Sequence, residues 1–209
     1  MKYFNSIINE DRWRKIIKKF INILFRYASL SGDVDILQGL VGRGADINGT
    51  NKHGVTPLLL AIRNGRLEVV KYLIKNGADI NKAKNDGTTP LLLATEEGDA
   101  GFIEYLIEHG ADIDKPNNDG HTALYIAARD GYVDIVSYLV EHGAEVDKSA
   151  SDGTTPLLEA AQNGREDIVE YLVEHGADIN RENINGDTPL SAAKKEGYED
   201  IVEYLSKFV

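Results

Sequence analysis

Residues 51–83 read NKHGVTPLLLAIRNGRLEVVKYLIKNGADINKA, and the outline of this stretch returns every 33 residues along the chain. Three columns of glycine share the period: Gly54, Gly87, Gly120, Gly153 and Gly186; Gly32, Gly65, Gly98, Gly131, Gly164 and Gly197; and Gly44, Gly77, Gly110, Gly143 and Gly176. A fixed period of this length is the signature of a repeat architecture. The repeat therefore decides the fold before any local structure is considered.

Each repeat carries the signals of two helices. A Thr-Pro pair precedes an apolar stretch at Thr56, Thr89, Thr155 and Thr188. The Thr hydroxyl can cap a free backbone N–H, and Pro at the first helical position loses no hydrogen bond. A longer second helix should follow a turn, as through Leu67–Ile74, and end where Gly77 can adopt the left-handed conformation. The sequence thus predicts turn, short helix, turn, longer helix and loop in every repeat.

The 33-residue period, the Gly-x-Thr-Pro-Leu turn and the Gly-Ala-Asp-Ile-Asn ending resemble those of the ankyrin-repeat family over residues 18–209. One helix pair has too little interior to be stable alone, so neighbouring pairs must stack. The resemblance implies an all-α solenoid of helix-turn-helix repeats with projecting turns, capped at both ends. We divide the chain into a basic amphipathic arm or cap helix, 1–17, and a repeat domain, 18–209, whose repeats are 18–50, 51–83, 84–116, 117–149, 150–182 and 183–209.

One feature of the family is missing from every repeat. Ankyrin repeats usually read Thr-Pro-Leu-His, and the resemblance implies that this His ties adjacent turns together by hydrogen bonds. Here the position holds Leu59, Leu92, Tyr125, Leu158 and Ser191. We therefore expect apolar contact to replace the polar network at this column.

Composition excludes several classes of chemistry. The chain has no Cys, so it can form no disulfide, iron–sulfur cluster or Cys-ligated zinc site. Its 34 Asp and Glu against 23 Lys and Arg give a net charge of -11, which argues against nucleic-acid binding. Most carboxylates recur in repeating columns, and no dissimilar catalytic groups converge in the pattern. We expect a protein that is not an enzyme and that holds no cofactor or metal.

Three histidines, His109, His142 and His175, form a column at the predicted ends of second helices. As shared metal ligands they would have to lie about 2 Å from one ion, whereas packed helices are about 8–10 Å apart. A His in the last turn of a helix can instead contact the last backbone carbonyls. We expect the carbonyl contact rather than a metal site.

A strip on the first helices and turns varies from repeat to repeat, while the framework columns stay fixed. In the ankyrin family the concave groove of first helices and turns is the usual protein-binding surface, which implies the same role here. An apolar patch of Leu60, Leu93 and Ile126 with a charged rim would form the centre of such an interface; a solvated face is the alternative. The partner-binding candidates are Val55, Leu60, Arg63, Thr88, Leu93, Glu96, His121, Ile126, Arg129, Thr154, Glu159 and Gln162.

The amino-terminal arm has the opposite charge to the rest of the chain. Residues 1–26 hold seven basic and two acidic residues, and the remainder holds 16 basic and 32 acidic residues. A basic amphipathic helix is predicted by the helical spacing of Trp13, Ile16, Ile17, Phe20, Leu24 and Tyr27. We expect its apolar side to cover the open end of the stack; the alternative is contact with an anionic membrane or with a partner's groove.

These observations favour a non-enzymatic protein–protein interaction module, and the alternative is a membrane-associated scaffold anchored by the arm. The acidic repeats suggest a protein partner with a basic patch. No apolar run approaches the ~20 residues of a membrane-spanning helix, and Lys and Arg interrupt the apolar residues near the amino terminus, unlike the core of a signal peptide. We therefore expect an intracellular, cytoplasmic protein. We also expect a monomer. The resemblance further implies that Asn48, Asn81 and Asn180 occupy a loop position at which ankyrin proteins can be hydroxylated.

Overall fold

The computed structural model describes residues 10–208, which form twelve α-helices, one 3₁₀ helix and no strand. This is the all-α repeat solenoid that the sequence predicts. The helices belong to two compact units, an amino-terminal unit that ends at Asn85 and a carboxy-terminal unit that begins at Asp86. Each unit is a stack of helix pairs with its own buried side chains.

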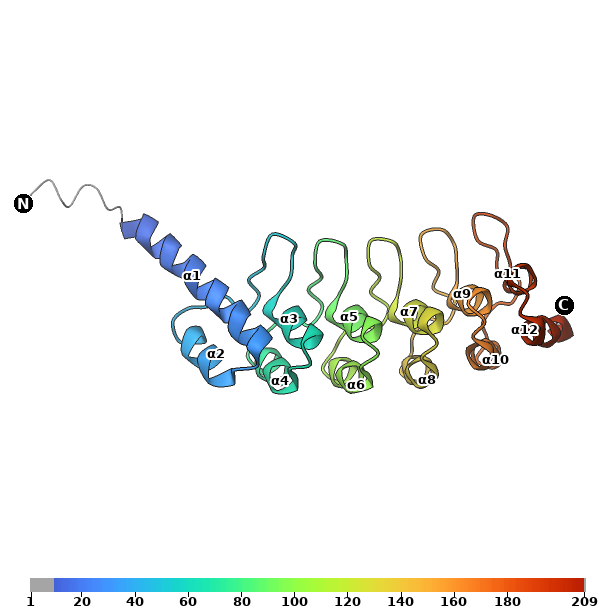
Figure 1. The fold of residues 1–209 in the computed structure, drawn as a ribbon, viewed down its shortest axis with the longest axis horizontal. Coiled ribbons are helices and arrows are strands. Elements are labelled where there is room, and N and C mark those ends of the chain that lie inside the picture. Colours follow the sequence, from blue (N-terminus) through green and yellow to red (C-terminus); the bar gives the residue numbers. More distant parts are fainter. Residues whose placement is uncertain (1–9, 209) are drawn as a thin grey trace, which may run out of the picture. The chain divides into compact units, whose positions relative to one another are not determined.

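The amino-terminal unit contains four helices: α1 (Glu10–Ser31), α2 (Val34–Val41), α3 (Pro57–Arg63) and α4 (Leu67–Lys75). Helix α1 contacts both α2 and α3, and α3 contacts α4. Among the described side chains of α1, the buried ones are Phe25, Ala28 and Ser29. Because these three lie near the carboxyl end of the helix, α1 joins the stack through its last turns (Figure 1).

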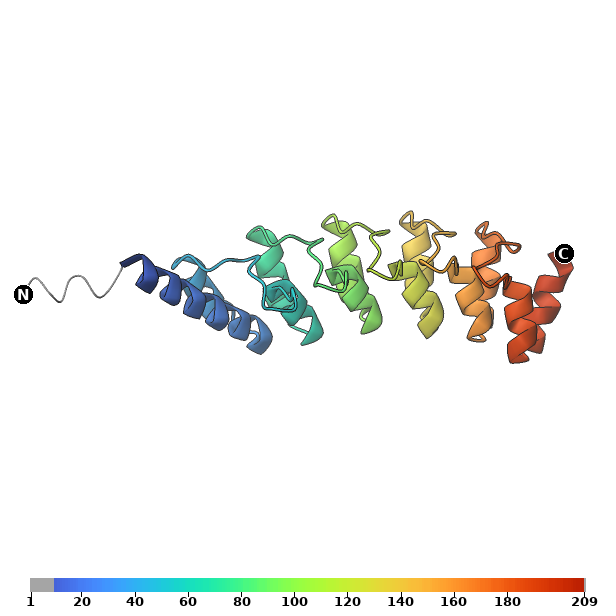
Figure 2. The ribbon, with the colours of Figure 1, turned by 90° about the horizontal axis from the view of Figure 1, so that it is seen from above.

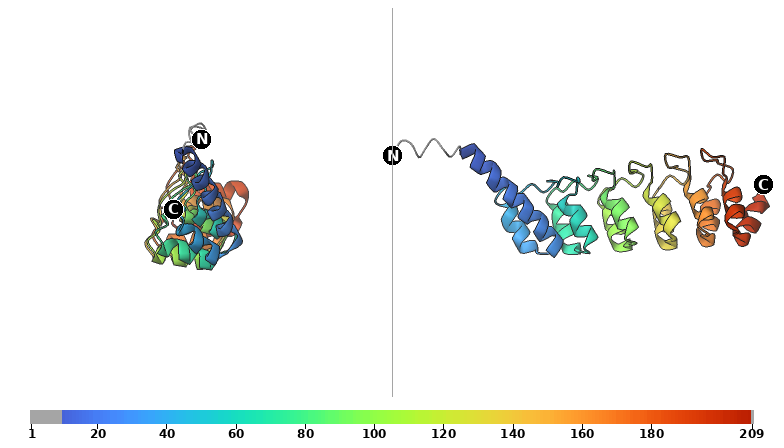
Figure 3. Two further views of the ribbon diagram at one scale, coloured as in Figure 1. Left: turned by 90° about the vertical axis from the view of Figure 1, so that its left-hand side faces the viewer. Right: turned by 45° about the horizontal axis from the view of Figure 1, so that its top comes forward.

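The carboxy-terminal unit holds the remaining described helices: α5 (Pro90–Glu96), α6 (Ala100–Glu108), α7 (Ala123–Asp130), α8 (Val133–Glu141), α9 (Pro156–Gln162), α10 (Glu166–Glu174), α11 (Pro189–Glu196), α12 (Glu199–Leu205) and the 3₁₀ helix η1 (Ser206–Phe208). The first helices α5, α7, α9 and α11 contact one another in series, as do the second helices α8, α10 and α12. Each first helix also contacts the second helix that follows it. The result is two helical layers from which the turns project in a row (Figure 1, Figure 3).

The first helices that follow a projecting turn begin as the Thr signal predicts. A Thr hydroxyl accepts a hydrogen bond from the backbone N–H three residues on, at 3.1–3.2 Å, for Thr56, Thr89, Thr122, Thr155 and Thr188. All of these residues except Thr188 are buried, so water cannot easily replace the bond. Thr122 caps its helix without a following Pro. The hydroxyl is therefore the feature common to these helix starts.

Backbone hydrogen bonds join the tips of the projecting turns. In the carboxy-terminal unit, donor N and acceptor O lie 2.9–3.0 Å apart in the pairs Asn118 with Asp86, Ser151 with Asp119, and Ile184 with Asp152. Glycine permits this close approach: Gly120 has a φ of +86°, and a Cβ there would lie 2.6 Å from Ser151 N. We call this series of bonds the tip ladder. In the amino-terminal unit it continues with Asn85 N and His53 O, at 3.0 Å.

The residues at the position where related repeats carry His make two kinds of contact. Leu59, Leu92 and Leu158 are buried, as expected for apolar contact. Tyr125 instead donates its hydroxyl hydrogen to Glu159, and Ser191 Oγ accepts the Thr188 N–H at 2.8 Å. The expectation of apolar contact is thus wrong at these two positions, because their hydroxyls find polar partners.

The loops at the other ends of the repeats are joined by side chains. A carboxylate or amide oxygen accepts the backbone N–H of a residue 31 positions on, at 2.8–3.0 Å, in the pairs Asn48 with Asp79, Asp114 with Glu145, and Asp147 with Asp178. Burial raises the pKa of Asp114 above its ordinary value. Of the three Asn positions named above, Asn48 and Asn81 are half-buried and Asn180 is exposed.

The arm does not cap the stack as expected. Helix α1 runs unbroken across the boundary predicted between residues 17 and 18, and residues 1–9 of the predicted arm lie outside the described residues. Of the six side chains expected to cover the stack, Ile16 is half-buried and the other five are 49–69% exposed, namely Trp13, Ile17, Phe20, Leu24 and Tyr27. They cannot cover it because α1 buries a different side, that of Phe25 and Ala28.

Candidate functional site

Three of the twelve partner-binding candidates lie in the amino-terminal unit. Arg63 ends α3 and is exposed, whereas Leu60 of the same helix and Val55 of the preceding turn are half-buried. Val55 N–H donates to Asn51 Oδ1 at 3.1 Å, which fixes the turn on which it sits. This unit therefore presents one charged side chain beside two partly covered aliphatic ones.

Four candidates in the carboxy-terminal unit are buried: Thr88, Leu93, Ile126 and Thr154 are 1–4% exposed. The cause is the packing of the first helices. Helix α7 contacts α5, α8 and α9, and it buries every residue from Ala123 to Ala128. Leu93 and Ile126 therefore belong to the core, and the predicted apolar surface patch is absent from this unit.

The other five candidates reach the surface of the carboxy-terminal unit. Glu96 and Gln162 end helices α5 and α9 and are exposed. His121 on a turn, Arg129 on α7 and Glu159 on α9 are half-buried. The surface that remains is polar and charged rather than apolar.

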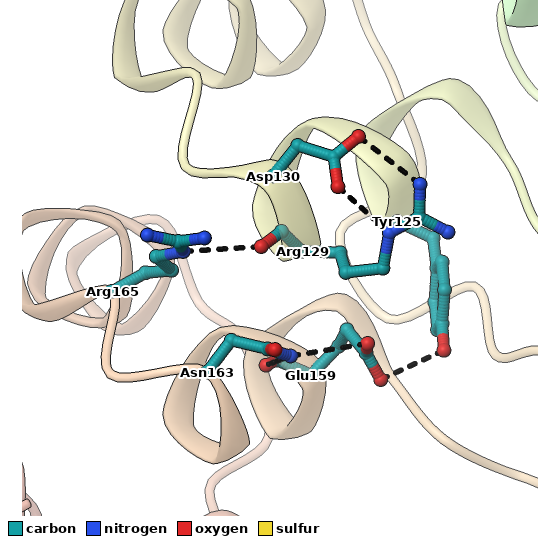
Figure 4. A network of polar contacts seen from close by, with 6 residues as sticks. All are labelled: Tyr125, Arg129, Asp130, Glu159, Asn163 and Arg165. Carbon is teal, nitrogen blue, oxygen red and sulfur yellow. Dashed lines mark hydrogen bonds and ion pairs between the residues drawn. The ribbon is translucent and has the colours of Figure 1, made fainter. Parts of the chain in front are cut away.

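Glu159 is the centre of a hydrogen-bond network (Figure 4). Its Oε2 accepts the Tyr125 hydroxyl hydrogen at 2.7 Å, and its Oε1 accepts from Asn163 Nδ2 at 3.1 Å. Asn163 Nδ2 also lies 2.8 Å from the Glu159 backbone O. Burial, followed by the bond to Glu159, raises the pKa of Tyr125 above its ordinary value. The network fixes the carboxylate of Glu159 between two helices.

Arg129 is held by its neighbour. Its Nε and Nη2 donate to the two carboxylate oxygens of Asp130 at 2.8 and 3.0 Å, and this pairing raises the pKa of Arg129 (Figure 4). The backbone O of Arg129 accepts from Arg165 Nε at 3.1 Å. Much of the charge of Arg129 is therefore neutralised within the protein, and its main chain is tied to the next repeat.

Sequence reasoning missed Tyr125 as a site residue. Its ring stacks on His121, with centroids 4.4 Å apart and an angle of 3° between the planes. Since the hydroxyl also binds Glu159, Tyr125 links a turn to α9. The signal available in the sequence was its position in the Thr-Pro-Leu-His column, where the family carries a polar ring.

A recess of about 230 Å³ lies beside this network. It is lined by Asp152, Thr154, Glu159, Gln162, Asn183, Asn185, Asp187, Ala192, Lys195 and Glu196. Four of these side chains are acidic and one is basic, so the recess has an excess of negative charge. Carboxylates in such a concave place can accept charge-assisted hydrogen bonds from a cationic group. We call it the acidic recess.

The histidine column has the structure that its sequence predicts. Nδ1 of His109, His142 and His175 lies 2.7–2.8 Å from the backbone O of a tyrosine four residues earlier. Each imidazole also stacks on the ring of that tyrosine, with centroids 3.9 Å apart. The expected contact with the last helical carbonyls is confirmed.

Among residues 10–208 there is neither a metal-binding cluster nor a helix that could span a membrane. Residues 10–208 include no cluster of three or more His, Cys, Asp or Glu side chains arranged to hold a metal ion. None of the described helices combines the length and apolar content that crossing a bilayer requires.

Comparison with known proteins identifies one family. A family model described as "Ankyrin repeats (3 copies)" matches residues 24–117, 81–150, 112–183 and 147–208. These matches overlap and together cover the chain from 24 to 208, which is most of its 209 residues. No curated protein matches the chain significantly.

Proposed function

The chain belongs to the ankyrin-repeat family, and we propose that it binds a protein partner through the acidic recess and the neighbouring turn tips of its carboxy-terminal unit. Ankyrin repeats are generally protein–protein interaction modules and are typically non-enzymatic. The finer question is which part of the repeats makes the contact. We favour the acidic recess, because it is concave and polar and four carboxylates line it.

The chemistry of the recess favours a partner that inserts a Lys or Arg side chain. Asp152, Glu159, Asp187 and Glu196 contribute carboxylates, and Lys195 is the one basic residue of its lining. A buried guanidinium or ammonium group needs both a counter-charge and hydrogen-bond acceptors, and carboxylates supply both. The acidic repeats as a whole would also attract a basic patch at longer range, since opposite potentials speed encounter.

Glu159 is prepared for such a contact. Tyr125 and Asn163 already hold its carboxylate in one position, so a partner would not have to immobilise a flexible side chain on binding. Preorganisation of this kind lowers the entropic cost of association. The exposed Gln162 belongs to the lining of the recess, and the half-buried His121 lies on a turn and adds to the polar surface.

The addition of positive charge to the recess tests the proposal. Peptides that bind the intact chain are first selected from a random displayed library, and their affinities are then measured by fluorescence polarisation. One variant carries Gln162→Arg and Glu196→Arg at the recess. Its control carries Glu170→Arg and Glu203→Arg, which change exposed residues of the second helices α10 and α12. Circular dichroism confirms that both are folded.

We expect the selected peptides to be rich in Lys and Arg, and the recess variant to bind them at least about tenfold more weakly, a loss of about 1.4 kcal/mol. The control should keep most of the affinity. Equal losses in the two variants would mean that overall charge attracts the peptides, and peptides without basic residues would contradict the proposed chemistry.

A further inference from the structure

One side of helix α1 is apolar and exposed. We call this side the α1 stripe, and it consists of Trp13, Ile17, Phe20, Ile23, Leu24, Tyr27 and Leu30, which are 38–69% exposed. Their spacing of three and four residues places them along one face of the helix. Soluble proteins rarely leave so many large apolar side chains together on the surface without a use for them.

The fold of the amino-terminal unit does not use the α1 stripe. Helix α1 packs on α2 and α3, and its buried residues Phe25 and Ala28 lie on another side of the helix. The amino-terminal turns of α1 extend beyond α2, as the views in Figures 1 and 2 agree. The aromatic residues Trp13, Phe20 and Tyr27 are seven positions apart, so they align along the stripe.

The helix is also strongly basic. Between residues 12 and 32 the chain has no Asp or Glu, and its basic residues are Arg12, Arg14, Lys15, Lys18, Lys19 and Arg26. Arg12, Lys19 and Arg26 recur every seven residues and therefore follow one edge of the stripe. An apolar face with aromatic residues beside a Lys- and Arg-rich face is the pattern of a helix that lies in a membrane interface.

The positive charge of α1 favours an anionic membrane over a second copy of the chain as the surface that covers the α1 stripe. If two α1 helices paired antiparallel through their stripes, the edge of Arg12, Lys19 and Arg26 would meet the same edge of its partner. No acidic residue between 12 and 32 could neutralise it. An anionic lipid surface offers both an apolar layer for the aromatic residues and phosphate or carboxylate groups for the basic edge.

We propose that the α1 stripe lies flat on an anionic membrane surface and so holds the repeats beside it. The apolar side chains enter the boundary between headgroups and acyl chains, and the basic side chains remain at the level of the headgroups. This inference is independent of the acidic recess, because it concerns a different unit and a surface of opposite charge.

Trp13 provides a direct readout because it is the only tryptophan of the chain. The full-length protein is mixed with vesicles of phosphatidylcholine alone or of phosphatidylcholine with phosphatidylserine, and emission and co-sedimentation are recorded. Since Trp13 is 49% exposed, its emission should start red-shifted and move to the blue only with phosphatidylserine. Binding should weaken as salt is added.

Two matched variants assign the binding to the stripe. Phe20→Glu with Leu24→Glu changes exposed stripe residues, and Ile184→Glu changes an apolar side chain that is 76% exposed on a turn of the other unit. The stripe variant should lose vesicle binding at least about tenfold, while the control keeps it. The melting curves of both should stay close to that of the parent chain.

Three results would overturn the inference. The first is an emission spectrum that does not respond to phosphatidylserine vesicles, or responds equally to phosphatidylcholine alone. The second is an equal loss of binding in the Ile184→Glu control. The third is a concentration-dependent dimer, seen by sedimentation equilibrium, that Phe20→Glu with Leu24→Glu abolishes, since the stripe would then join two copies of the chain.

Discussion

Helix α1 in the amino-terminal unit and helix α8 in the carboxy-terminal unit both carry apolar residues at helical spacing, but only α8 buries them. Its Ile135, Val136 and Leu139 are at most 4% exposed, whereas Phe20 and Leu24 of α1 are more than half exposed. Helix α8 contacts α7 and α10, whereas the buried residues among the described side chains of α1 all lie near its carboxyl end. Amphipathic spacing therefore specifies a helix, and the neighbours of that helix decide whether its apolar side is buried.

The largest expected difference between the two units is in the cost in stability of replacing one leucine of each unit by alanine. Leu139→Ala removes a side chain with no exposed surface, and we expect it to lower the free energy of unfolding by about 2–5 kcal/mol. Leu24→Ala removes a side chain that is 53% exposed, and we expect a change within about 0.5 kcal/mol. Urea titrations followed by circular dichroism measure both, and similar losses would contradict the comparison.

Both units contain part of the tip ladder, so replacing a ladder glycine by alanine should lower the stability of the protein by a similar amount in each unit. Gly54 and Gly120 have positive φ, and a Cβ there would lie 2.5 Å from Asn85 Oδ1 or 2.6 Å from Ser151 N. We expect Gly54→Ala and Gly120→Ala each to cost about 1–3 kcal/mol. Gly186→Ala is the control, because its φ is +78° but no atom lies within 4 Å of the Cβ.

Gly186→Ala should therefore cost less than the two ladder substitutions in the same urea titrations. If all three glycines respond equally, the left-handed backbone alone explains the cost and the close approach of the turns does not. If only the Gly120→Ala variant is destabilised, the ladder is not shared between the units.

Tyr125→Phe should have a smaller effect, confined to the carboxy-terminal unit. The substitution removes the hydroxyl that donates to Glu159, and we expect a loss of about 1 kcal/mol at neutral pH. Because the pKa of Tyr125 is raised in the folded state, the unfolded chain loses the phenol proton at a lower pH than the folded protein does. The stabilisation is therefore complete below about pH 10, the ordinary tyrosine pKa, and falls as the pH rises above it.

The pH dependence distinguishes Tyr125 from the other tyrosines. Unfolding is measured in urea at neutral pH and at alkaline pH for the parent chain and for Tyr125→Phe. The parent chain should lose more stability than the variant does over this range. Parallel losses would show that the hydrogen bond to Glu159 does not hold the phenol proton.

The smallest expected effects are increases in stability. Gly39 in α2 and Gly101 in α6 lie within helices, and a Cβ at either would meet nothing closer than 3.4 Å. Replacement by Ala should raise the free energy of unfolding by up to about 1 kcal/mol through the lower backbone entropy of the unfolded chain. We expect the larger gain at Gly39, since Gly101 lies in the first turn of its helix. Thermal melts compare the two variants, and a loss at Gly39 would contradict this.

The framework could be predicted from the sequence because its residues make contacts with residues close to them along the chain. Thr56 and its counterparts cap helices through their own hydroxyls, and His109, His142 and His175 reach carbonyls only four residues away. Such contacts depend on spacing along one chain segment. The 33-residue period then repeats them, which is why the fold and the family followed from the residues.

The candidate site was less predictable because it depends on neighbours. Leu93 and Ile126 occupy the same helical positions as the half-buried Leu60, yet they are buried. Tyr125 meets Glu159 across 34 positions, and no rule based on spacing within a helix could pair them. The exposure of α1 could not be predicted for the same reason. Its apolar side can be read from the sequence, but the helices that surround it cannot.

The tip ladder and the joined loops also bear on how this chain can change in length. Each repeat brings one donor and one acceptor to the ladder, and the same arrangement recurs 33 residues on. Copying or losing one whole period inside the carboxy-terminal unit would leave every tip with a partner, whereas an insertion of another length would break the bonds on both sides. Duplication of a complete repeat therefore preserves the hydrogen bonds to the repeats on either side. Whole repeats can add new surfaces while the existing ones are kept.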